Sequence, residues 1–141
     1  MKKIFISSDH AGFRLKETIK LFLSKKKIDF LDLGPNSDAR VDYPDYAHKV
    51  ARKVKKDKNS FGILVCGSGT GMSIVANKHK NIRAAQCFNL KSTKLSRLHN
   101  DANIITLGSR LLTKKNAVSF VGIFLDTNFE GGRHSKRIKK I

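Results

Sequence analysis

The sequence predicts an α/β fold in which five parallel strands form one sheet with helices on both faces. Short apolar runs alternate with helical patterns from one end of the chain to the other, which is typical of consecutive βαβ units. The third run, residues 61–66, is apolar enough to be buried on both faces, as strands of parallel sheets are. The 141 residues suit one domain, 1–141, because neither a linker nor an internal repeat interrupts them.

In the first half of the chain, strands are expected at 3–8, 28–34 and 61–66. Each is a short apolar run that ends at glycine or at polar side chains. Two helices are expected between them, because apolar residues recur there at the spacing of one helix face. These residues are Leu15, Ile19, Phe22 and Leu23 in the first helix, and Tyr46, Val50 and Val54 in the second.

In the second half, strands are expected at 82–88 and 103–108. Helical patterns precede each of them, over 71–79 and 90–98. A strongly amphipathic helix follows the last strand, because its apolar residues again share one face. These residues are Ala117, Phe120, Val121, Phe124 and Leu125, and the glycine-containing basic tail 126–141 comes after them.

The charge of the chain raises nucleic-acid binding as one candidate function. The formal net charge is +18, which is high enough to bring a nucleic-acid-binding α/β module into consideration. The lysines, however, stand in small scattered groups without interleaved aromatic residues. We therefore expect a solvated basic surface and no nucleic-acid partner.

The apolar runs and the cysteines argue against a secreted protein, a membrane protein, a redox dithiol and a structural metal site. The first apolar run stops at Ile6, which is too short for a secretory signal, and no later run approaches the roughly 18 apolar residues of a membrane span. We expect a cytoplasmic protein without a membrane partner. Cys66 and Cys87 form no CxxC pair and have no histidines at zinc spacing, so neither a redox dithiol nor a structural metal is expected.

Polar side chains collect near the ends of the expected strands. They are Asp9 and His10 after the first strand, Cys66 at the end of the third, His99 and Asn100 before the fifth, and Arg110 after it. Each of them alone is more often an ordinary surface group. Parallel sheets bind ligands outside the carboxyl ends of their strands, so we expect these segments to share one rim of the sheet.

The glycines behind the third strand predict a loop that binds negative oxygen. Gly67, Gly69 and Gly71 are spaced G-x-G-x-G, which differs from the dinucleotide fingerprint, and no Gly-Lys-Ser/Thr follows as in a Walker loop. What remains is a strand-to-helix turn whose backbone N–H groups face an anion. The thiolate of Cys66 at its start could act as a nucleophile or as a general base.

These motifs resemble those of the ribose 5-phosphate isomerase B and galactose 6-phosphate isomerase family. The resemblance covers almost the whole chain in fixed order, through SSDHAGFRLK, DYPDYA, GILVCGSGTGMSIVANK, IRAA, LSRLHNDANIITLGSR and EGGRHSKR. It implies a Rossmann-like three-layer α/β/α sandwich, and a homodimer or homotetramer with active sites at the subunit interface. It also implies an aldose–ketose isomerase for sugar phosphates that uses no metal and no cofactor.

The resemblance also implies catalytic roles. Cys66 would be the base that moves a proton between C1 and C2 of the open-chain sugar, and His99 would open the furanose ring. Asn100 would add a hydrogen bond, while Asp9 and Tyr43 would position sugar hydroxyls. The loop implied to hold the cis-enediolate comprises Gly67, Ser68, Gly69, Thr70 and Gly71.

The phosphate group is implied to bind among one histidine and three arginines, whose guanidinium groups match phosphate oxygens. These residues are His10, Arg110, Arg133 and Arg137. Arg133 and Arg137 are four residues apart, so a helical turn would place both on one face. The basic tail 126–141 would therefore complete the phosphate site.

Two loop positions depart from the family pattern. Ser68 stands where the family commonly has threonine, and it keeps the hydroxyl. Met72 stands where some relatives have a glutamate base. Since methionine cannot accept a proton, Cys66 is the only base candidate in the loop.

The expected activity is interconversion of D-ribose 5-phosphate and D-ribulose 5-phosphate in the non-oxidative pentose phosphate pathway. The alternative within the family is an allose 6-phosphate or galactose 6-phosphate isomerase. Galactose-type enzymes tend to divide the work between two unlike subunits, one of which lacks the catalytic cysteine. This chain has both Cys66 and His99, which favours the ribose enzyme.

Overall fold

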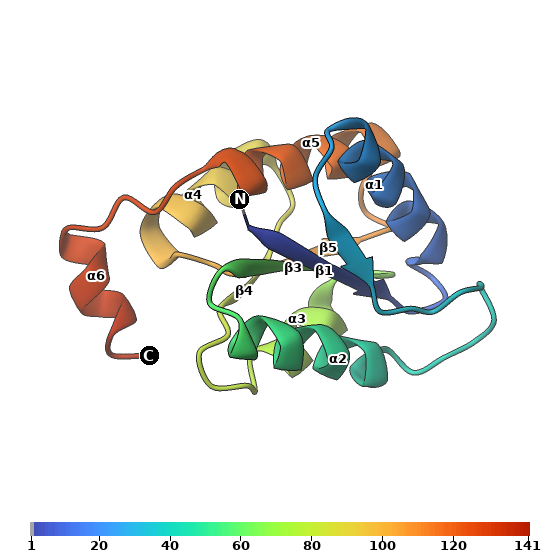
Figure 1. The fold of residues 1–141 in the computed structure, drawn as a ribbon, viewed down its shortest axis with the longest axis horizontal. Helices are drawn as coiled ribbons and strands as arrows, with labels where there is room; N and C mark the ends of the chain where they lie inside the picture. Colours follow the sequence, from blue (N-terminus) through green and yellow to red (C-terminus); the bar gives the residue numbers. More distant parts are fainter. Residues whose placement is uncertain (1) are drawn as a thin grey trace.

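One parallel sheet forms the centre of the fold, and its strands lie in the order β2-β1-β3-β5-β4 (Figure 1). The computed structural model describes residues 2–141, and every strand pair is parallel, as predicted. The strands are β1 Lys3–Ser8, β2 Phe30–Asp32, β3 Ser60–Cys66, β4 Ala84–Gln86 and β5 Ile104–Gly108. The strand order reverses between β1 and β3, because the chain passes from β1 to the edge strand β2 and returns on the other side of β1. Such a reversal is where open α/β sheets bind ligands.

Helices cover both faces of the sheet, which confirms the three-layer α/β/α sandwich. Figure 1 shows α1, α4 and α5 over one face and α2 and α3 over the other. The helices are α1 Phe13–Lys25, α2 Tyr43–Lys56, α3 Thr70–Ala76, α4 Leu90–Asn100, α5 Lys114–Asp126 and α6 Arg133–Ile138. The short helix α6 lies beyond the sheet, beside α4 (left in Figure 1). Within residues 2–141, no helix has the length and apolar character needed to cross a membrane.

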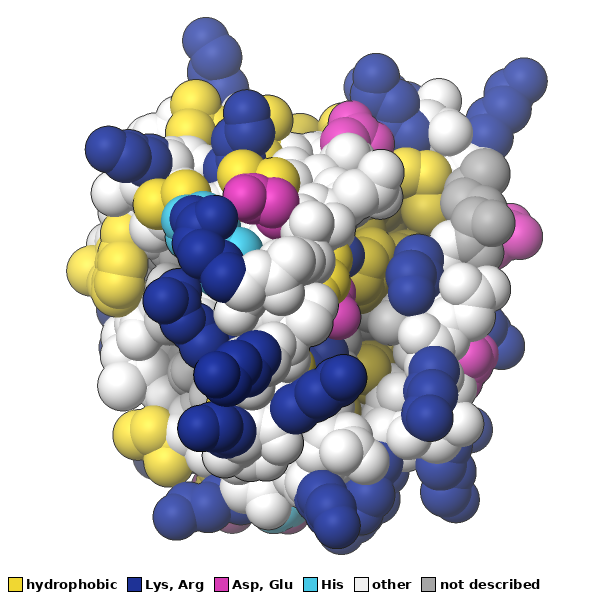
Figure 2. Space-filling view, turned by 90° about the vertical axis from the view of Figure 1, so that its left-hand side faces the viewer, with side chains coloured by type: hydrophobic (Ala, Val, Ile, Leu, Met, Phe, Trp, Pro, Cys, Tyr) yellow, Lys and Arg dark blue, Asp and Glu magenta, His cyan; other side chains and the backbone are white. Residues whose placement is uncertain are grey.

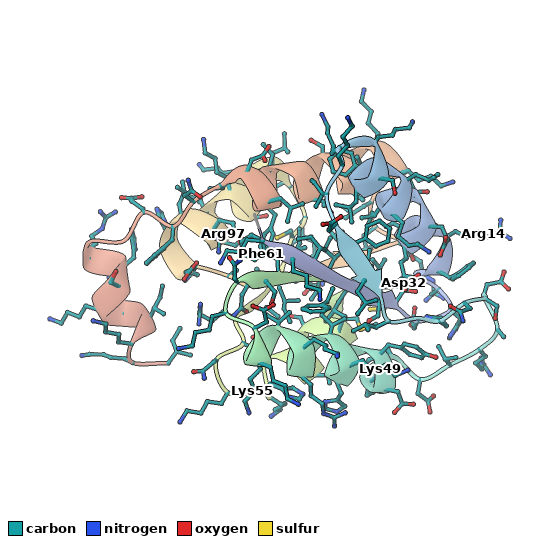
Figure 3. The ribbon with its side chains drawn as sticks, viewed as in Figure 1. Arg14, Asp32, Lys49, Lys55, Phe61 and Arg97 are labelled. Carbon is teal, nitrogen blue, oxygen red and sulfur yellow. The ribbon has the colours of Figure 1, made fainter. Side chains whose placement is uncertain are left out.

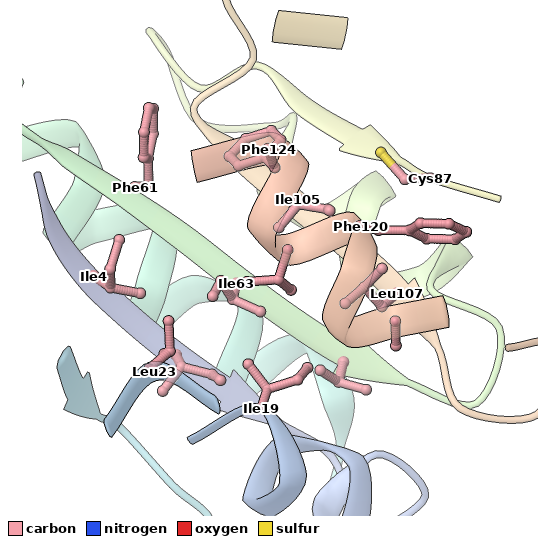
Figure 4. Close-up of a cluster of buried hydrophobic side chains, with 14 of the residues drawn as sticks. Ile4, Ile19, Leu23, Phe61, Ile63, Cys87, Ile105, Leu107, Phe120 and Phe124 are labelled. Carbon is pink, nitrogen blue, oxygen red and sulfur yellow. The ribbon is translucent and has the colours of Figure 1, made fainter. Parts of the chain in front are cut away.

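The central strand β3 separates two apolar cores. All of its residues are buried, which confirms that this strand packs on both faces. Ile63 and Val65 belong to the core under α1 and α5, whereas Leu64 and Cys66 belong to the core under α2 and α3. Figure 4 shows the first core, which also contains the buried side chain of Cys87. The two cysteines therefore lie on opposite faces of the sheet.

Two strands are shorter than the sequence predicts. The structure has three residues in β2 and three in β4, where the apolar runs extend over 28–34 and 82–88. Both strands are at an edge of the sheet and pair with one neighbour only, so each ladder ends early. Helix α4, in contrast, continues to Asn100 and stops where Asp101 takes a left-handed conformation with φ of 45°.

Candidate active site

The loop between β3 and α3 holds the thiol of Cys66. This side chain is buried, and the backbone N–H of Gly69 donates a hydrogen bond of 3.1 Å to its sulfur. Gly69 turns the chain with φ of +80°, and a Cβ there would lie 3.0 Å from the carbonyl carbon of Leu107, so glycine is required. Met72, one helical turn on, is fully buried in the same core as Cys66. Since methionine cannot accept a proton, the thiol of Cys66 is the candidate base of this loop.

Two side chains from other elements cover the loop. The ring of Tyr43, at the start of α2, lies on Gly71, where a Cβ would come within 2.6 Å of a ring carbon. The guanidinium of Arg110 lies on Gly67, where a Cβ would be 2.9 Å from Nη1. The backbone N–H of Arg110 also donates to the carbonyl oxygen of Gly67 over 2.9 Å. The absence of side chains at Gly67 and Gly71 therefore allows the ring of Tyr43 and the guanidinium of Arg110 to lie directly against the loop backbone.

The segment after β1 reaches the same edge of the sheet. The backbone N–H of Asp9 donates to the carbonyl oxygen of Val65 over 3.1 Å, and its buried carboxylate accepts a 2.9 Å bond from the N–H of Gly12. The Nδ1 of His10 lies 3.3 Å from the backbone nitrogen of Val41, which comes from the loop before α2. An open pocket here is lined by Asp9, His10, Arg40, Val41, Asp42, Tyr43, Pro44 and Asp45.

Two residues at this edge were not predicted from the sequence. Gln86 ends β4, and its Nε2 donates to the carbonyl oxygen of Ser68 over 2.9 Å and to the hydroxyl of Thr70 over 2.8 Å. It was not singled out because the predicted strand extends to residue 88, whereas the observed β4 ends at Gln86. Arg40 lines the open pocket, but it comes from a polar loop without periodic spacing that could place it.

His99 and Asn100 lie elsewhere, and the prediction of one shared rim is wrong for them. They end α4 directly before β5, and residues that precede a strand lie at the amino edge of a parallel sheet. The carbonyl oxygen of Asn100 accepts a 3.1 Å bond from Nε of Arg83, which precedes β4. The next residue, Asp101, lines a pocket together with residues at the starts of β1 and β3. Because the two residues precede β5 in the sequence, their order along the chain already places them at the amino edge, opposite the edge where Cys66 lies.

His99 belongs instead to a cluster between α4 and α6. Its ring stacks on His134, with centroids 4.2 Å apart and planes 16° from parallel. Its Nε2 lies 3.8 Å from a carboxylate oxygen of Glu130, whose other oxygen is 3.6 Å from Nη1 of Arg133. Arg133 and Arg137 both lie in α6, which confirms the predicted helical turn. Figure 2 shows this end of the molecule, where a small area of histidine lies under a lysine or arginine side chain and next to an acidic one.

Arg97 fixes the end of α4 that carries His99. The guanidinium of Arg97 is buried and donates to the carboxylate of Asp101 over 2.8 Å and to the carbonyl oxygen of Thr127 over 3.1 Å. It also lies over the ring of Phe61, 4.6 Å from the centroid (Figure 3). These contacts tie α4 to β3 and to the end of α5, so the backbone next to His99 has a fixed position.

The candidate site is therefore divided between two ends of the sheet. The carboxyl-edge half-site consists of Asp9, His10, Tyr43, Cys66, Gly67, Ser68, Gly69, Thr70, Gly71 and Arg110. The α4–α6 half-site consists of His99, Asn100, Arg133 and Arg137. The first supplies a thiol, backbone N–H donors and a guanidinium, and the second supplies an imidazole and two guanidinium groups. Proton transfer to carbon and binding of a phosphate are the chemistry that the two halves support together.

Comparison with known proteins gives a consistent assignment. The model of the ribose/galactose isomerase family matches residues 4–141. The chain is 43% identical over 141 residues to ribose-5-phosphate isomerase B of Escherichia coli, covering 100% of this chain and 95% of that protein. It is similar to the ribose 5-phosphate isomerase structure from Thermotoga maritima, with a TM-score of 0.96 and 49% identity over 99% of this chain and 96% of the other. It is also similar to ribose-5-phosphate isomerase B from Mycoplasma genitalium with bound ribulose-5-phosphate, with a TM-score of 0.95 and 47% identity over 98% and 92% of the two chains. The chain belongs to the ribose/galactose isomerase family.

Proposed function

We propose that this chain is an aldose–ketose isomerase that interconverts D-ribose 5-phosphate and D-ribulose 5-phosphate. The observation that carries the proposal is the sulfur of Cys66, held by the N–H of Gly69 inside a glycine loop that Arg110 covers. The relative from Mycoplasma genitalium, which holds ribulose-5-phosphate, supports this substrate class. In this proposal the protein acts in the cytoplasm, in the non-oxidative pentose phosphate pathway.

Cys66 is proposed as the base that moves the proton between the two carbons. Its thiolate removes the proton from C2 of the open-chain aldose, and the electron pair forms a C1–C2 double bond while O1 becomes negative. The proton of the O2 hydroxyl then passes to O1, and the thiol returns its proton to C1 as the C2 carbonyl forms. Backbone N–H groups of residues 67–71 would stabilise the negative oxygen, by roughly 2.7–4 kcal/mol for each donor in comparable sites.

His99 is proposed to open the furanose ring, since only the open chain can isomerise. Its imidazole would accept the proton of the anomeric hydroxyl and give a proton to the ring oxygen as the C1–O4 bond breaks. Asn100 would add a hydrogen bond, and Asp9 and Tyr43 would position sugar hydroxyls. The phosphate would lie among His10, Arg110, Arg133 and Arg137.

A complete site requires a second copy of the chain, because the thiol and the imidazole lie at opposite edges of one sheet. We propose a homodimer, or a homotetramer built from such dimers, in which the α4–α6 half-site of one copy meets the carboxyl-edge half-site of its partner. Apolar side chains near the edge strand β4 support such an interface. Phe88 and Leu90 follow β4, Ile74 lies on the neighbouring helix α3, and between 50% and 58% of each is exposed.

The alternative within the family is a hexose phosphate substrate, allose 6-phosphate or galactose 6-phosphate. The presence of both Cys66 and His99 in one chain favours the ribose enzyme, since identical copies can then build complete sites. Steady-state assays on the three sugar phosphates test the choice. The highest kcat/KM is expected for D-ribose 5-phosphate, and a higher value for either hexose phosphate would contradict the proposal.

A further inference from the structure

We propose that His99, Glu130 and His134 form a binding site for a divalent cation of the zinc class. The three side chains each offer a ligand atom, and these atoms all lie within 4.8 Å of one another. The sequence does not show this set at zinc spacing, because His99 ends α4 while the other two residues flank the turn into α6. The fold, and not a local motif, brings the three donors together.

The donor set suits zinc in kind and in number. Two imidazoles and one carboxylate are a ligand set that Zn²⁺ takes in sites with a fourth position open to water. With zinc–nitrogen distances of about 2.0–2.1 Å, tetrahedral ligand atoms lie about 3.4 Å apart. The Nε2 of His99 and the carboxylate of Glu130 are 3.8 Å apart, and 46% of the Glu130 side chain is exposed. A small movement of this exposed carboxylate therefore closes the distance.

His134 supplies an independent observation that points to a ligand. The residue is only 5% exposed, and its Nε2 is buried without a hydrogen-bond partner among residues 2–141. Buried polar atoms of this kind normally have a partner. A cation bound among the three side chains would supply that partner.

Two features oppose the cation and limit its affinity. The rings of His99 and His134 are stacked within 16° of parallel, so they must tilt to direct nitrogens at one point. Arg133 already lies 3.6 Å from the carboxylate of Glu130 and competes for it. The site is therefore expected to bind zinc reversibly, in contrast to a structural zinc site that holds a fold together.

The consequence for activity rests on the proposed function of His99. A zinc ion on the imidazole occupies the nitrogen that must exchange protons with the sugar, so zinc would inhibit the isomerase. The inhibition should be strongest on ring-closed D-ribose 5-phosphate, because ring opening is the step assigned to His99. Glu130 and His134 would act in this site only as ligands of the ion.

Zinc binding is best measured in a Cys66→Ala background, because the thiol could itself bind the ion. Calorimetric titration with ZnCl₂ should show binding that becomes at least about tenfold weaker on adding Glu130→Gln, since even outer-shell changes at metal sites cost 10- to 100-fold. His134→Gln should have the same effect, with folding checked by circular dichroism. Equal zinc affinity in the Cys66→Ala protein and in the same protein with Glu130→Gln would overturn the site.

A second histidine pair provides the matched control. His48 and His79 lie 2.7 Å apart, Nδ1 to Nε2, between α2 and the segment after α3, away from α6. His48→Gln in the Cys66→Ala background should leave zinc affinity unchanged, and loss of binding in it would place the ion at that pair and overturn the proposal. In proteins with Cys66 intact, zinc should inhibit the wild type at a lower concentration than it inhibits Glu130→Gln, because any inhibition through the thiol is common to both. Binding that depends on Glu130 but causes no inhibition would support the cation site and contradict the proposed role of His99.

Discussion

The division of the proposed site between the two edges of the sheet predicts that two inactive variants regain activity when mixed. Cys66→Ala removes the proposed base from the carboxyl-edge half-site, and His99→Asn removes the acid–base group from the α4–α6 half-site. In a two-fold dimer each active site takes one half-site from each copy. A mixed dimer therefore contains one site with both substitutions and one site with neither.

The size of the effect follows from this arrangement. After random exchange of equal amounts, about half of the dimers are mixed and each has one intact site of two, so about one quarter of wild-type activity is expected. The assay follows isomerisation of D-ribose 5-phosphate before and after subunit exchange, with mixed dimers counted by native mass spectrometry. A control mixture of Cys66→Ala with Arg110→Ala should not recover, because both substitutions alter the carboxyl-edge half-site. Mixed dimers that form without regaining activity would refute a site shared between copies.

Three further predictions concern single substitutions. Cys66→Ala should still bind ribulose 5-phosphate in calorimetry but lose turnover. The control Cys87→Ala, which changes a thiol in the other core, should keep its turnover. Normal turnover of Cys66→Ala would rule out the proposed base. Gly71→Ala places a methyl group 2.6 Å from a ring carbon of Tyr43, so KM for the sugar phosphate should rise with little change in melting temperature, and an unchanged KM would contradict the contact. Burial alone would raise the pKa of Asp32, but hydrogen bonds from two lysines of α1 outweigh it and hold the pKa below its ordinary value of 3.8. This stabilisation is present above the unfolded-state pKa and is lost as the pH falls through the folded-state pKa, so urea unfolding should show a steeper acid loss of stability in the wild type than in Asp32→Asn. Parallel pH profiles for the two proteins would argue against the ion pair.

The layers of the fold could be predicted because buried positions hold apolar residues, and the spacing of those residues differs between strands and helices. The run 61–66 is apolar throughout since β3 packs on both faces, and Leu15, Ile19 and Leu23 share one buried helix face. The ends of β2 and β4 could not be predicted, because they depend on how many neighbours a strand has. That number is set by the strand order, which no local pattern contains.

The carboxyl-edge half-site was within reach of the sequence for a similar reason. Cys66 and its glycines stand where a predicted strand ends, and the carboxyl ends of parallel strands meet at one edge. His99 was misplaced because it precedes a strand and so belongs to the opposite edge. The contacts of His134 and Glu130 could not be predicted either, since they depend on how the last helix folds back toward α4.

The same geometry explains why the proposed chemistry needs association. A strand-to-helix turn such as residues 67–71 places backbone N–H groups at the carboxyl edge, which is where a negative oxygen would develop in the proposed mechanism. A helix-to-strand connection such as the one after α4 lies at the amino edge, so an imidazole there cannot reach the thiol of its own chain. Two-fold pairing would build two complete sites at once, because the symmetry that brings the imidazole of one copy to the thiol of its partner also brings the second imidazole to the second thiol. In the proposed dimer, any change that separates the copies would therefore stop isomerisation of the ring-closed sugar without altering either His99 or Cys66.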